Sequence, residues 1–279
     1  MIPMTTHSLT IPTRKLLWLS DIHLDQVQDE EKRRFFSRLE SSHCDAVMVT
    51  GDIATSGHLI ANLSEISRVF GTTPVMFVLG NRDYFGSSFS EVDSGVEKLC
   101  KTHRNLVALG KGEIIELSPD TALVGHRGWF DGLAGAGART RVASADRYHI
   151  SDFTGVDRAG YFRKLRELGR ESAVYFRRVL PAALLQYRTV LVATHVPPFT
   201  QALRHAGTHC HWQRQPFLSN SSAGNAIVGI SRRFGHRRIV VHAGHSHSPA
   251  TVSLSPNLEI QVAGAQPGCP AMQKILTID

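Results

Sequence analysis

Short apolar runs, each the length of a β-strand, recur along the chain at residues 16–19, 46–49, 75–79, 106–109, 122–124, 190–193 and 239–241. The runs are almost continuously apolar, which is typical of strands buried on both faces. After each of the first three runs comes a segment whose apolar residues have helical spacing: Phe35, Phe36 and Leu39, then Ile60, Leu63, Ile66 and Phe70, then Phe89, Val92, Val96 and Leu99. A strand followed by a helix, repeated in this way, predicts a layered α/β fold.

The rest of the chain departs from this alternation. Residues 250–254, 258–263 and 273–278 are strand-like runs separated by Pro and Gly turns, which predicts a meander of antiparallel strands. A charged segment with spaced apolar residues predicts a helix over 158–185. The stretches 132–152 and 201–225 have no clear periodicity, as is typical of lids or binding loops. Because no linker divides the chain, we expect one domain over 1–279, with these two stretches as cap segments.

Composition narrows the class of protein. The chain has 279 residues, of which 42% are apolar, enough to fill the core of a folded domain and to exclude disorder as its main state. No stretch reaches the roughly 18 to 20 apolar residues of a membrane span. Residues 1–15 contain no apolar signal core, so we expect a cytoplasmic location. The four cysteines form no C-x-x-C pair and indicate neither a disulfide framework nor a thiolate zinc site. The net charge of +7 favours an anionic partner.

Polar residues that can bind a metal follow five of the apolar runs, and these residues are Asp21 and His23, Asp52, Asn81, His195, and His245 and His247. The carboxyl ends of strands in an open α/β sheet are where ligands bind, so we expect these turns to meet at one edge. Each turn alone is a weak indication, because Gly, Asp and Asn are common after strands. Their recurrence after five runs of one chain makes a shared site the better interpretation.

The chemistry of these side chains points to divalent metal ions. Imidazole, carboxylate and amide donors without a thiolate suit ions such as Mn, Fe, Zn or Co. Seven donors are too many for one tetrahedral ion. If one carboxylate bridges, two ions roughly 3.5 to 4 Å apart can activate a water and hold the oxygens of a phosphoryl group. The donor set therefore predicts hydrolysis of a phosphate ester.

The same residues resemble the signature of a known family. In order and spacing, the motifs are similar to those of calcineurin-like metallophosphoesterases: Asp21-x-His23, Gly51-Asp52, Gly80-Asn81-x-Asp83, His195 and Gly244-His245-x-His247. The resemblance covers residues 21–247 and implies an α/β fold, a four-layer αββα sandwich of two mixed β-sheets flanked by helices. It also implies two divalent ions, Mn first and Fe, Zn, Co or Ni as alternatives, with a bridging hydroxide that attacks phosphorus. One ion would lie on Asp21, His23, Asp52 and His247, and the other on Asp52, Asn81, His195 and His245.

One position departs from the family pattern. Many members have His where this chain has Arg82, and that His is thought to protonate the leaving group. Arginine stays charged and cannot act as a general acid near neutral pH, but it can clamp a phosphate oxygen. We therefore expect phosphodiesters or pyrophosphate-type bonds as substrates, with Asn81, Arg82 and Asp83 as candidate catalytic residues. The alternative for Arg82 is a structural salt bridge to Asp83.

The fragment from Gly80 to Asp83 is also similar to UDP-diacylglucosamine pyrophosphatases of lipid A synthesis. Those enzymes continue with a metal-binding His in a His-Gly-Asp turn. Here the matching turn places Val196 and two prolines after His195, as in general phosphoesterases. Lipid A chemistry is therefore disfavoured.

Several weaker signals lie elsewhere in the chain. His126 and Arg127 follow a predicted strand and are candidate substrate contacts, whereas His205, His209 and His211 are better interpreted as solvated surface. We expect a small phosphate ester as the partner. A nucleic acid is possible but not favoured, because no basic tract with interleaved aromatic residues is present to stack bases. A non-catalytic, protein-binding scaffold on the same fold and a nuclease are the alternative functions.

Overall fold

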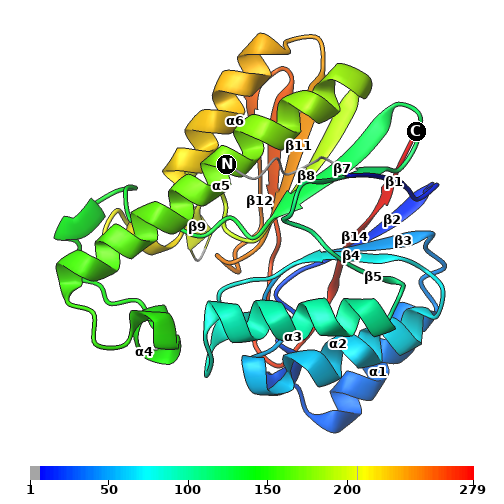
Figure 1. Cartoon of the computed structure of the whole chain (residues 1–279), viewed down its shortest axis with the longest axis horizontal. Helices are drawn as coiled ribbons and strands as arrows, with labels where there is room; N and C mark the ends of the chain where they lie inside the picture. Colours follow the sequence, from blue (N-terminus) through cyan, green and yellow to red (C-terminus); the bar gives the residue numbers. More distant parts are fainter. Residues whose placement is uncertain (1–6, 206) are drawn as a thin grey trace.

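Two β-sheets lie against each other between layers of helices in the computed structural model, which describes residues 7–205 and 207–279 (Figure 1). The five-stranded sheet has the order β14 (Met272–Thr277), β2 (Lys15–Leu19), β3 (Ala46–Thr50), β4 (Val75–Val78) and β5 (Leu106–Ala108). The seven-stranded sheet has the order β1 (His7–Thr10), β6 (Glu113–Glu116), β7 (Thr121–His126), β8 (Thr189–Thr194), β11 (Arg238–Ala243), β13 (Leu258–Val262) and β12 (Ala250–Ser255). A separate hairpin joins β9 (Arg204–His205) and β10 (Thr208–His209).

Helices cover the outer face of each sheet, as Figure 1 shows. The five-stranded sheet is covered by α1 (Asp29–Glu40), α2 (Ser56–Phe70) and α3 (Phe89–Thr102). The seven-stranded sheet is covered by α5 (Arg158–Gln186) and α6 (Ser221–Arg233), and the short α4 (Asp146–His149) lies in the connection that precedes α5. The predicted four-layer αββα sandwich is therefore confirmed.

The alternation of side chains along buried strands explains the layers. In β2, Leu17 and Leu19 pack with the helices outside, while Leu16 and Trp18 point into the layer between the two sheets. Burial on both faces is why the strands read as continuous apolar runs in the sequence.

Parallel pairing brings the carboxyl ends of neighbouring strands to the same edge of each sheet. In the five-stranded sheet β2 pairs with β3 and β3 with β4, and in the seven-stranded sheet β8 pairs with both β7 and β11, all in parallel. The turns that follow β2, β3, β4, β8 and β11 therefore leave the sheets in a common direction. This arrangement is what allows residues far apart in the chain to form one site.

Parts of the predicted organisation are wrong. The last three strands do not form an antiparallel meander, because β13 pairs with β12 in antiparallel but with β11 in parallel, and β14 crosses to the other sheet to pair with β2. The predicted helix over 158–185 is confirmed as α5, but α6 begins at Ser221, inside the stretch predicted to be irregular. No helix in the described part of the chain combines the length and apolarity needed to cross a bilayer.

A histidine lies in the apolar layer between the sheets. His242 on β11 is 1% exposed, and its ring is edge-on to that of Trp18 with 4.8 Å between centroids. Burial lowers the pKa of His242 from 6.5 to about 3, because the charged ring would lose its hydration there.

We expect His242→Leu to make the metal-free protein less sensitive to acid. An unfolded histidine takes up a proton as pH falls through 6.5, whereas folded His242 stays neutral to about pH 3. Lowering the pH within this window therefore destabilises the fold by about 1.4 kcal/mol per unit. Denaturant unfolding at pH 6.5 and pH 5 should show the variant losing about 2 kcal/mol less than the unsubstituted protein. Equal losses in the two proteins would contradict this account.

Candidate metal centre

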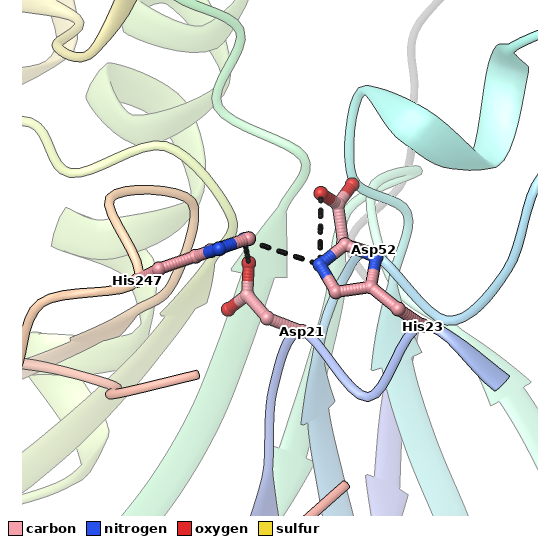
Figure 2. Close-up of side chains that lie close together, drawn as sticks. All are labelled: Asp21, His23, Asp52 and His247. Atoms are coloured by element: carbon pink, nitrogen blue, oxygen red, sulfur yellow. Dashed lines mark hydrogen bonds and ion pairs between the residues drawn. The ribbon is translucent and has the colours of Figure 1, made fainter. Parts of the chain in front are cut away.

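Four predicted metal ligands come together where strands of the two sheets end. Asp21 and His23 follow β2, Asp52 follows β3 and His247 follows β11, and Figure 2 shows their polar atoms turned toward one another. One ligand atom from each residue lies within 4.8 Å of all the others. The Nε2 atoms of His23 and His247 are 3.1 Å apart, and His247 Nε2 is 3.3 Å from Asp21 Oδ1.

The remaining three predicted ligands lie directly beside this group. His195, which follows β8, has its Nε2 atom 3.0 Å from Asn81 Oδ1 and 3.3 Å from Asp52 Oδ1. The ring of His245 lies 5.1 Å, centroid to centroid, from that of His195. Asp52 therefore stands between the two groups, in contact with His23 on one side and His195 on the other. All seven residues singled out in the sequence meet in one place.

Backbone carbonyls fix the orientation of two of these histidines. His195 Nδ1 donates to Thr50 O at 2.8 Å, so a neutral ring carries its lone pair on Nε2, the atom that faces Asn81 and Asp52. His245 Nε2 donates to Phe217 O at 2.7 Å, which leaves Nδ1 as the ligand atom. Such partners for the second ring nitrogen are usual for metal-binding histidines.

The contacts at the centre of the site fit a cation. Asn81 donates through Nδ2 to Asp146, so the atom that it presents to His195 Nε2 is its carbonyl oxygen Oδ1. In the neutral histidine, both atoms of that 3.0 Å pair are then acceptors. The Nε2 atoms of His23 and His247 also face each other at 3.1 Å, with two nearly buried carboxylates alongside. A divalent ion between His195 and Asn81 would resolve the conflict between their acceptor atoms.

Backbone strain is concentrated at the same residues. Among the described residues, six that are not glycine have a positive φ, and five of them are Asp21, His23, Asp52, His245 and His247. The left-handed conformation is unfavourable for side chains with a Cβ and persists where the surroundings impose it. Here it turns each side chain from the end of its strand toward the centre.

Glycines precede three of the ligands for a steric reason. A Cβ on Gly51 would lie 2.7 Å from the backbone N of Gly80, one on Gly80 would overlap the carboxylate of Asp52, and one on Gly244 would overlap that of Asp21. The Gly-Asn and Gly-His pairs of the sequence therefore let the turns from different strands approach one another closely.

Burial controls the protonation of the site. It raises the pKa of Asp52 well above the ordinary value, and the negative charge of Asp21 adds to that effect. Burial acts the same way on Asp21, but the hydrogen bond with His247 and the influence of His195 outweigh it and lower the pKa. Burial has the opposite effect on histidine, whose charged form is the protonated one: it lowers the pKa of His23 to about 4 and that of His245 to about 3. His23 and His245 are therefore held in the neutral form that metal coordination requires, whereas for His247 burial is outweighed by the hydrogen bond and charge of Asp21, which raise its pKa.

Asp83 and Arg82 lie in the turn after β4. Asp83 is fully buried and accepts hydrogen bonds from the backbone N–H groups of Gly80, Asp52, Ile53 and Ala54 at 2.7 to 3.1 Å. Among the described residues Arg82 forms no salt bridge with Asp83. Its guanidinium lies over the ring of Phe85, with Cζ 5.4 Å from the centroid, and its backbone N–H donates to Asp52 Oδ1.

The other candidate residues have contacts of a different kind. Arg127 donates to Tyr84 and pairs with Asp93, and His126 packs on the ring of Tyr175, so neither is brought to the ligand cluster by these contacts. Trp129 is buried in the core. The side chains of His205, His209 and His211 are exposed, in agreement with a solvated surface.

Comparison with known proteins decides the family. A family model described as calcineurin-like phosphoesterase matches residues 14–249. The chain belongs to that family. The match includes all seven candidate ligands, and family and fold together indicate a metal-dependent phosphoester hydrolase.

A solved structure supports the fold of this phosphoesterase. A dimetal phosphatase from Danio rerio is 14% identical and has a TM-score of 0.56, with the match covering 91% of this chain and 88% of the other. The protein TT1561 of Thermus thermophilus is also similar but less so, at 12% identity and a TM-score of 0.48, with coverage of 90% and 89%. No curated protein sequence matches this chain.

Sequence reasoning missed several groups that orient the ligands of the phosphoesterase. They are the carbonyls of Thr50 and Phe217, the Asp146 carboxylate and the Phe130 ring, which stacks on His245 with 5.7 Å between centroids. A carbonyl leaves no signal in residue type, and Asp146 lies in a stretch without periodicity. Both predicted cap segments thus reach into the site, through Asp146 and Phe217.

We expect Gly80→Ala to weaken metal binding while the protein stays folded. The added Cβ would overlap the Asp52 carboxylate and so displace the residue shared by the two groups of ligands. Mn bound per chain, measured after gel filtration, should fall well below that of the unsubstituted protein. The matched control is Gly57→Ala, where the new Cβ meets no atom within 4 Å. Equal metal binding in the two variants would show that the turns can move apart without consequence.

Proposed function

We propose that this chain hydrolyses phosphate esters with two divalent ions held by the seven residues of the candidate metal centre. One ion would be held by Asp21, His23, Asp52 and His247, and the other by Asp52, Asn81, His195 and His245. Mn is the first choice, and Fe, Zn, Co and Ni suit the same oxygen and nitrogen donors. The observation that carries the proposal is the pairing of two acceptor atoms, His195 Nε2 and Asn81 Oδ1, at 3.0 Å.

The residues around the centre create a site for an anion. Bound divalent ions would activate a water for attack on phosphorus and neutralise the phosphoryl oxygens. Asp21 and Asp52 supply only two negative charges to two divalent cations, so the loaded site keeps a net positive charge that attracts phosphate. The carbonyls of Thr50 and Phe217 keep the imidazoles of His195 and His245 in the tautomers that coordination needs.

Arg82 is the proposed substrate contact beside the metals. The structure gives its guanidinium an aromatic neighbour, Phe85, and no carboxylate partner among the described residues, so its donors are free for a phosphate oxygen. Because arginine cannot supply a proton near neutral pH, poor leaving groups lose their usual acid. This favours phosphodiesters, pyrophosphate-type bonds and esters with good leaving groups. Asp83 is proposed to position the turn, since its carboxylate already accepts four backbone hydrogen bonds.

The activity is tested on matched chromogenic substrates. Protein loaded with Mn is expected to hydrolyse a nitrophenyl phosphodiester and the nitrophenyl monoester, because nitrophenolate leaves without a proton, but to hydrolyse the phenyl monoester far more slowly. Arg82→His is expected to raise the rate on the phenyl monoester relative to the nitrophenyl monoester, because histidine would restore a proton donor for the poorer leaving group. Absence of turnover on both nitrophenyl esters, with Mn bound, would favour a protein-binding scaffold instead. Salt-sensitive cleavage confined to nucleic acid would favour a nuclease.

Two variants separate metal binding from substrate contact. Asp52→Asn is expected to remove most bound Mn and all measurable turnover, because Asp52 contacts both groups of ligands. Arg82→Ala is expected to keep both ions and to lower kcat/KM on a diester by about 10²-fold, the order lost with one charge-stabilising donor. Metal content and initial rates are measured on the same preparations.

The control for Arg82 is Arg139→Ala, which removes an exposed arginine from the 132–152 segment. It should change neither metal content nor kcat/KM. Loss of metal in Arg82→Ala equal to that in Asp52→Asn would refute the division of roles, and so would an equal fall in rate for the two arginine variants.

A further inference from the structure

A short part of the predicted cap is attached along its length to the turn that carries Asn81 and Arg82. Gly86 N–H donates to His149 O at 2.7 Å, Ser151 N–H donates to Ser87 O at 3.0 Å, and Phe89 N–H donates to the Asp152 carboxylate at 2.9 Å. These contacts place residues 144–152 beside the turn after β4. The segment is therefore in a position to control that turn.

Asp146 is the residue of this segment that reaches a metal ligand. Its Oδ1 accepts the Nδ2–H of Asn81 at 2.7 Å, and its Oδ2 accepts the hydroxyl of Ser144. Asp146 is 4% exposed and Ser144 is 7% exposed, so solvent does not compete for either bond. With both oxygens bonded, the carboxylate has a fixed orientation.

This fixed carboxylate decides which end of the Asn81 amide faces the centre. The amide oxygen and nitrogen occupy nearly the same volume, and only hydrogen bonding distinguishes the two orientations. Without Asp146, the NH₂ group could turn inward and donate to His195 Nε2, which is 3.0 Å from the present oxygen. That orientation would satisfy a metal-free site but would present a donor where an ion needs a lone pair.

We propose that Asp146 is a positioning residue that keeps the carbonyl oxygen of Asn81 directed at the second metal ion. The proposal rests on the proposed dinuclear function. In this proposal the 144–152 segment orients a metal ligand, in addition to any role as a cap over the site. Removing such a partner of a ligand typically weakens metal binding 10- to 100-fold.

The test compares Mn binding to Asp146→Ala, Asp146→Asn and the unsubstituted protein by isothermal titration, with EPR to distinguish a spin-coupled Mn pair from a single ion. Asp146→Ala should bind the first Mn normally and the second at least 10-fold more weakly, with loss of the coupled signal. Asp146→Asn should recover most of the second-site affinity. Its amide oxygen can accept from Asn81 while its NH₂ group donates to Ser144.

The matched control is Asp152→Ala, which breaks the bond to Phe89 in the same segment without touching a ligand. It should retain both Mn affinities and the coupled signal. Circular dichroism and thermal unfolding verify that each variant is folded. If Asp146→Ala does not fold, Asp146→Ser replaces it, because a hydroxyl on the shorter side chain cannot bond Asn81 and Ser144 as the carboxylate does.

The outcomes separate this proposal from the function on which it rests. Unsubstituted protein that binds fewer than two Mn ions would overturn the dinuclear site and the role of Asp146 with it. Two ions in the unsubstituted protein and unchanged affinities in Asp146→Ala would overturn only the role of Asp146. Equal weakening of the second Mn affinity in Asp146→Ala and Asp152→Ala would also overturn the role of Asp146, and so would a failure of Asp146→Asn to recover that affinity. Neither result is expected if Asp146 acts by orienting the Asn81 amide.

Discussion

Mutual repulsion among acceptor atoms is the constraint on which this structure depends. His195 Nε2 faces Asn81 Oδ1 with a lone pair on each atom, and the carboxylates of Asp21 and Asp52 are almost completely buried beside this pair and beside His23 and His247. In a protein interior such a group is unstable unless cations or protons lie between its members. To serve as the proposed metal centre, the fold has to hold these atoms together before any cation binds, and the rest of the architecture can be understood from that requirement.

Rigid strands and tight turns meet the requirement together. Each ligand follows a strand buried between layers, so its backbone is fixed by the sheet up to the last residue before the turn. The turns then adopt left-handed conformations at Asp21, His23, Asp52, His245 and His247, which are unfavourable unless the surroundings impose them. Asp83 contributes directly, because its carboxylate binds backbone N–H groups of the turns after both β3 and β4. Strain and repulsion are thus balanced by hydrogen bonds that are themselves buried.

Patterns of neighbouring apolar and polar residues predict individual strands, helices and turns, but they do not predict which distant residues will pair. That the seven candidate ligands lie together was predictable because each is a polar residue placed shortly after an apolar run, and parallel strands bring such ends together. The pairing of β14 with β2 was not, because the pattern of 272–277 shows that a strand forms but not which of two sheets it joins. Asp146 and the carbonyl of Phe217 were missed for another reason: their partners are 65 and 28 residues away and no periodic pattern surrounds them.

The turn after β4 connects metal binding with substrate choice. Asn81, a proposed metal ligand, and Arg82, the proposed phosphate contact, are adjacent, and residues 144–152 support both. Asp146 holds the amide of Asn81, while the ring of His149 stacks on Phe85, the aromatic neighbour of Arg82, with 4.9 Å between centroids and an interplanar angle of 19°. A rearrangement of this one segment would therefore alter the orientation of a ligand and the position of the guanidinium at once. Because the segment contains only α4 and the start of a 3-10 helix (Ser151–Phe153) and contributes no strand to either sheet, its sequence can vary without disturbing the sheets, which makes it a route by which the proposed metal centre could acquire a different substrate.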